Sequence, residues 1–181
     1  PERHRLRSEI YSKARYPQKH LPLPAKPLTK PKRIRIGYFS TDFKEHPVAY
    51  LIAKVLEQHN RDQFEVFGYS LYGSSSGEMR QRLEKSFDSF TDVQSMSDRD
   101  IALQAQQDGI DIAVDLTGYT ANSRSGILAF RAAPVQVNYL GYPGSMGAEF
   151  IDYIVADQHL IPPENQKHFS EKQIYLPDVY L

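Results

Sequence analysis

Short apolar runs alternate with segments of helical periodicity along most of this chain, and this alternation constrains the fold more than any other feature of the sequence. The runs are rich in β-branched and aromatic residues, which is typical of buried strands. Strands and helices in alternation, joined by right-handed crossovers, predict an α/β fold with a Rossmann-like, doubly wound and mostly parallel sheet. We expect strands at 34–39, 64–69, 89–93, 110–116, 135–139 and 173–176, a further apolar stretch at 153–156, and helices at 48–56, 77–85, from Ser97 to the turn at 108–109, and 122–131.

Two other segments precede this domain. Residues 1–16 predict a short basic helix, with Leu6, Ile10 and Tyr11 on a side that needs a partner surface. Residues 17–32 contain five prolines, which remove backbone donors and restrict their neighbours, so we expect an extended proline-rich linker. The Rossmann-like domain is then expected to cover residues 33–181.

Composition and charge exclude several functional classes. Acidic and basic residues balance at 22 each, and the basic run at 26–35 alternates with prolines, so we expect no nucleic-acid partner. No segment approaches the ~20 apolar residues of a membrane-spanning helix. The absence of cysteine excludes disulfides and thiolate metal sites and is compatible with the cytoplasm. No histidine pair has metal-ligand spacing, so we expect no metal and interpret these histidines as surface residues: His4, His20, His59, His159 and His168.

The first candidate site lies between the first expected strand and the helix that follows it. Asp42 and His46 stand at the carboxyl end of that strand, where the exposed N–H groups of a helix start favour an anionic ligand. An imidazole can exchange protons near neutral pH, and a carboxylate can orient it or accept a proton. The alternative is that Asp42 caps the turn and that His46 is a structural residue before Pro47.

Two further loops follow expected strands and would border the same crevice. The segment 115–124 carries hydroxyls, an aromatic ring and Arg124, which could hold a peptide or sugar; alternatively, Thr120 or Asn122 caps the next helix and Arg124 is solvated. The segment 140–147 is rich in glycine, which allows close approach of the backbone to a ligand. It matches neither the dinucleotide fingerprint nor a P-loop.

An ordered series of short motifs resembles the N-terminal catalytic lobe of the protein O-linked N-acetylglucosamine transferase family. The resemblance runs from about Arg33 to the end, and residues 1–16 resemble the helical segment that joins this family's tetratricopeptide repeats to its catalytic region. No single motif is specific, whereas their order and spacing are. The motifs are Arg35-Ile36-Gly37-Tyr38 with Asp42-Phe43 and His46-Pro47, then Phe64-Glu65-Val66-Phe67, Asp108-Gly109-Ile110, Gly118-Tyr119-Thr120, Ala133-Pro134-Val135-Gln136 and Leu140-Gly141-Tyr142-Pro143-Gly144.

The resemblance implies one lobe of a GT-B glycosyltransferase that moves N-acetylglucosamine from UDP to Ser or Thr hydroxyls of proteins, with inversion, without a metal or other cofactor. It implies that a C-terminal lobe absent from this chain holds most of the UDP-sugar donor, so residues 1–181 alone should be nearly inert. By position, His46 and Asp42 match catalytic residues, whereas the substrate-binding residues would be Pro47, Tyr119, Thr120, Arg124, Leu140 and Gly141. The sequence departs from the family pattern at Val48 (threonine), Asp115 (asparagine) and Ala121 (lysine).

Two alternatives remain open at this point. A flavodoxin-like regulatory or interaction module, such as a phosphate receiver, would use Asp115 as its phosphorylated residue. Another GT-B enzyme or a UDP-sugar epimerase would share the same lobe, and its products would distinguish it.

Overall fold

The computed structural model describes residues 2–17, 20–24, 32–73 and 76–180. Parts of the expected linker (18–19 and 25–31) and of the serine-rich loop (74–75) lie outside these ranges. Within them, seven strands form a single sheet in the order β3-β2-β1-β4-β5-β6-β7, and every pairing is parallel. The strands are β1 (Ile34–Ser40), β2 (Phe64–Ser70), β3 (Ser89–Asp92), β4 (Ile112–Asp115), β5 (Val135–Asn138), β6 (Tyr153–Ala156) and β7 (Lys172–Tyr175).

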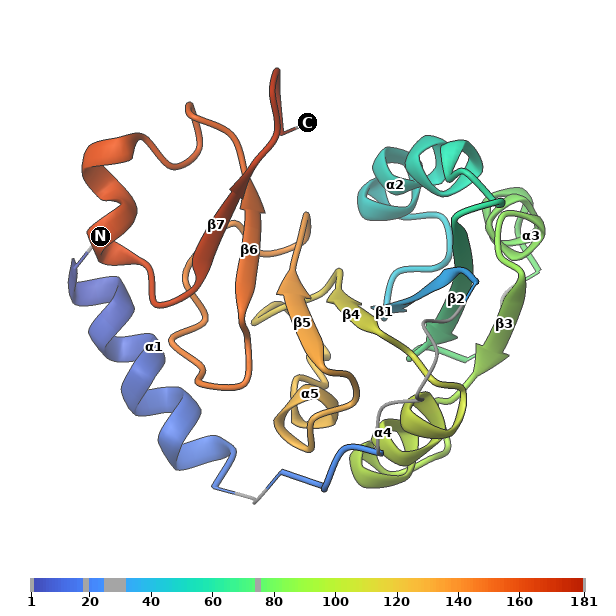
Figure 1. Ribbon diagram of the computed structural model, residues 1–181, viewed down its shortest axis with the longest axis horizontal. Helices are drawn as coiled ribbons and strands as arrows, with labels where there is room; N and C mark the ends of the chain where they lie inside the picture. The colour runs from blue at the N-terminus through green and yellow to red at the C-terminus, as the bar shows by residue number, and fades with distance from the viewer. Residues whose placement is uncertain (1, 18–19, 25–31, 74–75, 181) are drawn as a thin grey trace.

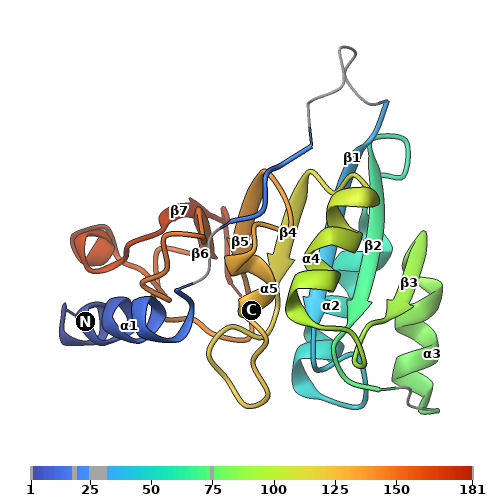
Figure 2. The ribbon, with the colours of Figure 1, turned by 90° about the horizontal axis from the view of Figure 1, so that it is seen from below.

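Helices cover both faces of this sheet, as Figures 1 and 2 show. One face carries α2 (Pro47–Gln58) and α3 (Glu78–Lys85), and the other carries α4 (Asp98–Gln107) and α5 (Gly126–Ala129). A strand that is buried on both sides sends alternate residues to opposite faces. In β1, Tyr38 accordingly packs in the α2 and α3 core, whereas Phe39 packs in the α4 and α5 core. The predicted doubly wound α/β fold is confirmed, with an entirely parallel sheet.

The helix boundaries follow from local sequence signals. Pro47 occupies the first turn of α2, where its missing N–H costs no hydrogen bond. Ser97 caps α4 as predicted, its hydroxyl oxygen accepting from the N–H of Asp100 at 3.2 Å. The prediction of a helix over 122–131 is wrong in extent, because α5 covers only Gly126–Ala129. Both Asn122 (φ 61°) and Arg131 (φ 66°) adopt the left-handed conformation, which ends helical geometry on either side.

The strand order places a topological switch point between β1 and β4, since the chain winds outward from β1 through β2 and β3 and then returns to continue through β4 on the other side. In open α/β sheets ligands bind outside the carboxyl ends of the strands at such a point. The loops that follow β1, β4 and β5 all leave the sheet at this edge. These loops contain the three segments that the sequence singled out.

Helix α1 (Glu2–Arg15) lies along the β6 and β7 side of the molecule, far from the first strand in Figure 1. On the side predicted to need a partner surface, Leu6 is 48% exposed and Ile10 is 69% exposed, whereas the ring of Tyr11 lies 5.0 Å from that of Tyr119. Its buried residues are Ser8 and Ser12. A β-carbon at Gly147 would lie 2.4 Å from the backbone nitrogen of Glu9, so the helix backbone rests directly on this glycine.

After α1 the chain stays in contact with the domain. The backbone N–H of Leu21 donates to the carbonyl of Phe130 at 2.9 Å, and Tyr16 and Leu21 pack against the α4 and α5 core. The described part of the expected linker is therefore partly anchored. The short 3-10 helix η1 (Pro163–His168), which the sequence did not predict, precedes β7.

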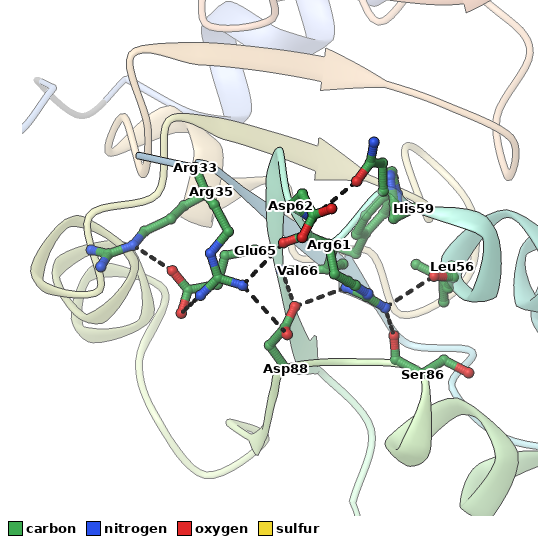
Figure 3. A network of polar contacts seen from close by, with 12 residues as sticks. Arg33, Arg35, Leu56, His59, Arg61, Asp62, Glu65, Val66, Ser86 and Asp88 are labelled. Carbon is green, nitrogen blue, oxygen red and sulfur yellow. Dashed lines mark hydrogen bonds and ion pairs between the residues drawn. The ribbon is translucent and has the colours of Figure 1, made fainter. Parts of the chain in front are cut away.

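A network of ion pairs joins the amino ends of β1, β2 and β3, at the edge of the sheet opposite to the switch-point loops (Figure 3). Arg35 pairs with Glu65 at 3.0 Å, and Arg61 pairs with Asp88 at 2.8 Å. His59, expected on the surface, is half-buried there, and its Nε2 lies 2.8 Å from the hydroxyl of Tyr38. The network is structural, since these side chains satisfy one another.

Candidate active site

The loop after β1 is anchored by an aromatic side chain, and its polar residues stay at the rim. Phe43 is 2% exposed and packs edge-on against Phe87, with ring centroids 5.4 Å apart. The N–H of Asp42 donates to the hydroxyl of Ser40 at 2.9 Å, which fixes the turn directly after the strand. In the sequence Ser-Thr-Asp-Phe the phenylalanine is thus buried, and the side chain of Asp42 stays 15% exposed at the carboxyl end of β1.

His46 is the N-cap of α2, so it has the structural role before Pro47 that the sequence left open as the alternative for this histidine. Its backbone is extended (φ −151°, ψ 146°), as the following Pro47 requires. Nδ1 of His46 accepts a hydrogen bond from the N–H of Val48 at 3.3 Å, and it lies 3.8 Å from Oδ1 of Asp42. The predicted catalytic pair is therefore close together, with the imidazole 39% exposed and the carboxylate 15% exposed.

This capping bond selects a tautomer for the neutral imidazole. An Nδ1 atom that accepts from Val48 carries no proton, so the ring proton is on Nε2. In this state Nε2–H can donate a hydrogen bond to a ligand oxygen, while the carboxylate of Asp42 remains an acceptor. The geometry thus makes His46 a hydrogen-bond donor and Asp42 a hydrogen-bond acceptor toward a ligand.

The loop after β4 is organised by Asp115, which is 4% exposed. Oδ1 of Asp115 accepts from the N–H groups of Thr117 and Gly118 at 2.8 and 3.0 Å, and the hydroxyl of Ser125 lies 3.5 Å from Oδ2. Burial raises the pKa of this carboxyl, against the lowering effect of those hydrogen bonds. A receiver aspartate must be accessible to its phosphodonor, so this buried, internally bonded carboxylate argues against the receiver alternative.

Tyr119 and Thr120 occupy the tip of the same loop. The hydroxyl of Thr120 donates to the carbonyl of Thr117 at 2.9 Å, which closes the turn. The ring of Tyr119 is 5.0 Å from that of Tyr11 and 5.7 Å from that of Tyr142, and burial raises the pKa of its hydroxyl. Tyr119 therefore connects α1 with the loops after β4 and β5.

Arg124 has its guanidinium occupied by the protein. Nε donates to Asp98 at 2.8 Å, and the terminal nitrogens donate to the carbonyls of Val93, Gln94 and Met96. It is neither a solvated charge nor free to bind a ligand in this arrangement. Its contacts fix the β4 loop against the segment that leads into α4.

The loop after β5 approaches the end of β4 closely. Leu140 is 8% exposed and has a left-handed backbone with φ 76°. A β-carbon at Gly141 would lie 2.1 Å from the carbonyl oxygen of Leu116, so only glycine fits there. The side-chain amide of Asn138 donates to the carbonyl of Tyr142 at 2.9 Å and stabilises the turn.

The three loops form one continuous surface. The N–H of Thr41 donates to the hydroxyl of Thr117 at 3.2 Å and joins the loops after β1 and β4. Gly141 joins the loops after β4 and β5 through its contact with Leu116. The predicted site residues on these loops are thus brought to one edge of the sheet.

Helix α1 adds residues that the sequence reasoning missed. His4, interpreted as a surface histidine, has its Nε2 2.9 Å from the hydroxyl of Tyr142. Together with Tyr11 it borders a pocket of about 360 Å³ that also includes Tyr119. The available signal was the spacing of 4, 8 and 12 on one helical face, but its partner surface lies more than one hundred residues away in the sequence.

Two observations bear on metal and membrane binding. Across 2–17, 20–24, 32–73 and 76–180, no three His, Asp or Glu side chains are grouped so that they could hold a metal ion. Within the same ranges, none of the helices combines the length and apolar character needed to cross a membrane.

A parallel sheet in Rossmann order, with polar loops gathered at its switch point, defines an α/β lobe of the doubly wound class. Residues 11–181 match the family described as glycosyl transferase family 41. The chain therefore belongs to glycosyl transferase family 41.

Individual relatives agree with this assignment. The chain is 44% identical over 149 residues to the Arabidopsis thaliana protein named probable UDP-N-acetylglucosamine–peptide N-acetylglucosaminyltransferase SEC, covering 82% of this chain and 15% of that protein. It is 37% identical over 150 residues to the Caenorhabditis elegans UDP-N-acetylglucosamine–peptide N-acetylglucosaminyltransferase, covering 82% of this chain and 13% of that protein. A solved structure of a Thermobaculum terrenum O-GlcNAc transferase mutant superimposes with a TM-score of 0.88 at 35% identity, covering 98% of this chain and 34% of that one.

Proposed function

We propose that this chain is the N-terminal catalytic lobe of an inverting glycosyltransferase that moves N-acetylglucosamine from UDP to Ser or Thr hydroxyls of proteins. The convergence of the loops after β1, β4 and β5 at the switch point carries this proposal. Family membership and the printed names of the relatives support the choice of donor and acceptor. They also favour a protein transferase over a UDP-sugar epimerase.

The two residues of the β1 loop receive separate roles. Nε2–H of His46 donates to an oxygen of the sugar or of the attacking hydroxyl and holds the two reactants in line. The carboxylate of Asp42, 3.8 Å from the other ring nitrogen, receives the hydroxyl proton directly or through a water molecule. Pro47 supports this geometry by keeping His46 extended at the helix start.

The remaining predicted residues shape the acceptor side. Tyr119 offers an aromatic wall, and Leu140 and Gly141 bring the backbone close to the sugar. Thr120 and Arg124 act by holding the β4 loop, because their polar atoms are already bonded within the protein. The proposal thus separates ligand contacts from supporting contacts.

The chain spans 13–15% of the length of these two curated relatives and 34% of the solved structure. In the proposal, most donor contacts, including the group that stabilises the departing diphosphate, come from a C-terminal lobe. Residues 1–181 alone should therefore bind UDP weakly and transfer almost no sugar. A cytoplasmic location, compatible with the cysteine-free sequence, is part of the same proposal.

The test uses the full-length protein that carries this lobe, incubated with labelled UDP-N-acetylglucosamine and a cell lysate. Mass spectrometry should find the sugar on Ser or Thr residues of proteins. His46→Ala should abolish most of this labelling, while His159→Ala, a matched change at an exposed histidine, should leave it unchanged. Labelled UDP-sugar binding without any modified protein, or release of an altered free nucleotide sugar, would refute the proposed reaction.

A further inference from the structure

A pocket of about 360 Å³ separates the flank of α1 from the tips of the loops after β4 and β5. We call it the α1 pocket. Its walls are aromatic rings and hydroxyl groups, and it is held in shape by the contacts of Tyr119 with Tyr11 and of His4 with Tyr142. The residues that border it and matter here are His4, Arg7, Tyr11, Tyr119, Thr120 and Tyr142.

The α1 pocket has a cationic side chain at its border. Arg7 borders it, and among the described residues that line it there is no carboxylate. Glu171, whose charge affects Tyr119 and Tyr142, is 2% exposed, and its oxygens accept from the N–H of Met146 at 2.6 Å and from the hydroxyl of Ser145 at 2.8 Å. The carboxylate oxygens of Glu171 are thus already used as acceptors by the loop after β5.

Arg7 stands apart from its neighbour on the helix. Arg5 donates to the carbonyl of Lys167 at 3.2 Å and pairs with Glu9 at 3.6 Å. Arg7 is exposed and makes no hydrogen bond or ion pair with any residue in the described part of the chain. An arginine at the mouth of an aromatic pocket, without a carboxylate of its own, is suited to the planar two-oxygen geometry of an external carboxylate.

We propose that the α1 pocket binds an acidic side chain of the acceptor polypeptide, close to the hydroxyl that receives the sugar, with Arg7 as the cationic contact. The inference rests on the proposed function and extends it to acceptor choice. Tyr119 and Thr120, assigned to the acceptor side, form one wall of this pocket, so a bound polypeptide that reaches them passes Arg7. Arg7 would then determine specificity without taking part in the sugar transfer.

The donor diphosphate shares this anionic chemistry, but the pocket is a poor match for it. Phosphate groups in α/β folds are held by backbone N–H groups at a helix start. The α1 pocket instead lies beside the middle of α1 and is bordered by side chains, among them three tyrosine rings that would pack on the aliphatic part of a glutamate. The geometry therefore favours a peptide carboxylate.

The test measures peptide binding to the full-length protein that carries this lobe, by fluorescence anisotropy and without any sugar donor. One labelled peptide carries a Ser flanked by glutamates, and its partner carries glutamine at the same positions. The glutamate peptide should bind roughly 3- to 10-fold more tightly at low salt, and this preference should fade at high salt as exposed charges are screened. Arg7→Gln should make the two peptides bind equally, whereas Arg99→Gln, which removes an exposed charge from α4, should keep the preference.

Three outcomes would overturn the inference: no peptide binding, an undiminished preference in the Arg7→Gln variant, or displacement of the glutamate peptide by UDP with the same dependence on Arg7. Circular dichroism of Arg7→Gln should match that of the parent protein, since Arg7 makes no hydrogen bond or ion pair within the described residues. Binding is read without transfer, so a failure of sugar transfer would count against the proposed reaction and leave the peptide preference as a separate result.

Discussion

Replacing Asp115 should lower the free energy of unfolding if the new side chain has no hydrogen-bond acceptor, and should leave it equal or higher if an acceptor is kept. The carboxylate is buried and accepts from the backbone N–H groups of Thr117 and Gly118. Asp115→Ala leaves both donors unpaired in a buried loop, which costs about 1–3 kcal/mol each, or roughly 2–6 kcal/mol in total. Asp115→Asn keeps the Oδ1 acceptor and removes the buried charge, so the protein should be as stable as the parent or more stable.

The pH dependence of this difference supplies a sharper test. Burial raises the pKa of Asp115, so the folded protein binds more protons than the unfolded chain. The stability that this protonation contributes is complete below the ordinary pKa of 3.8 and is lost as the pH rises through the folded pKa. Each unit of the shift is worth about 1.4 kcal/mol. The advantage of Asp115→Asn should therefore be near zero in acid and should grow with pH.

Urea denaturation of the parent chain and both variants, from pH 4 to pH 8, provides the measurement. Tryptophan is absent, so far-ultraviolet circular dichroism is the appropriate signal. If Asp115→Asn is as destabilised as Asp115→Ala at every pH, the argument fails, because the charge itself would then be required. An advantage of Asp115→Asn that does not change with pH would refute the assigned direction of the pKa shift.

The other predictions concern separate parts of the molecule. In the full-length protein, His46→Ala should lower turnover about 10²-fold or more, measured as the rate of sugar transfer at saturating donor, and an unchanged rate would remove the imidazole from the mechanism. Gly147→Ala should detach α1, because a β-carbon would lie 2.4 Å from the helix backbone at a residue with φ 58°; faster hydrogen exchange in residues 2–15 with unchanged exchange in the sheet would show this. Burial lowers the pKa of His59, so the stability contributed by the neutral imidazole is complete above its ordinary pKa of 6.5 and is lost as the pH falls below that value. The urea midpoint of the parent protein should therefore fall between pH 7 and pH 5, and this fall should be smaller in His59→Gln. Arg124→Gln should cost about 1–3 kcal/mol of stability, since it breaks a partly buried ion pair, and an unaltered denaturation midpoint would contradict the supporting role of this residue.

The elements of the sheet could be predicted because each buried strand carries its own signal. Ile36, Tyr38 and Phe39 lie in a near-continuous apolar run, which indicates a strand buried on both faces, and Ser97 stands at the helix start that its hydroxyl caps. The all-parallel pairing follows from the crossovers that helices between strands require. These inferences need only local sequence and general rules of chain topology.

The extent of α5 could not be predicted from the same kind of evidence. Asn122 and Arg131 adopt left-handed backbone conformations that non-glycine residues rarely occupy. Tertiary contacts stabilise the second of them: the guanidinium of Arg131 pairs with Asp152 at 2.8 Å and donates to the carbonyl of Pro134 at 2.7 Å. A helical pattern read without these partners extends too far at both ends.

The position of the candidate site could be predicted from the sequence, whereas the hydrogen-bond partners of its side chains could not. Asp42 and His46 follow a strand, so their place at the switch point could be inferred. That Nδ1 of His46 is used by Val48, and that Arg124 is fully paired, depends on contacts between separate segments. His4 was missed for the same reason, because its partner Tyr142 lies 138 residues further along the sequence.

The packing of α1 on the domain affects how freely the sequence of this helix can evolve. Ser8 and Ser12 are its buried residues, and Gly147 forms its support, so little apolar area secures the helix. Substitutions at Arg7 or Tyr11 would therefore cost the sheet almost no stability. A lineage could remodel this helix to accept different partners while the hydrophobic core and the catalytic loops remain under separate constraint.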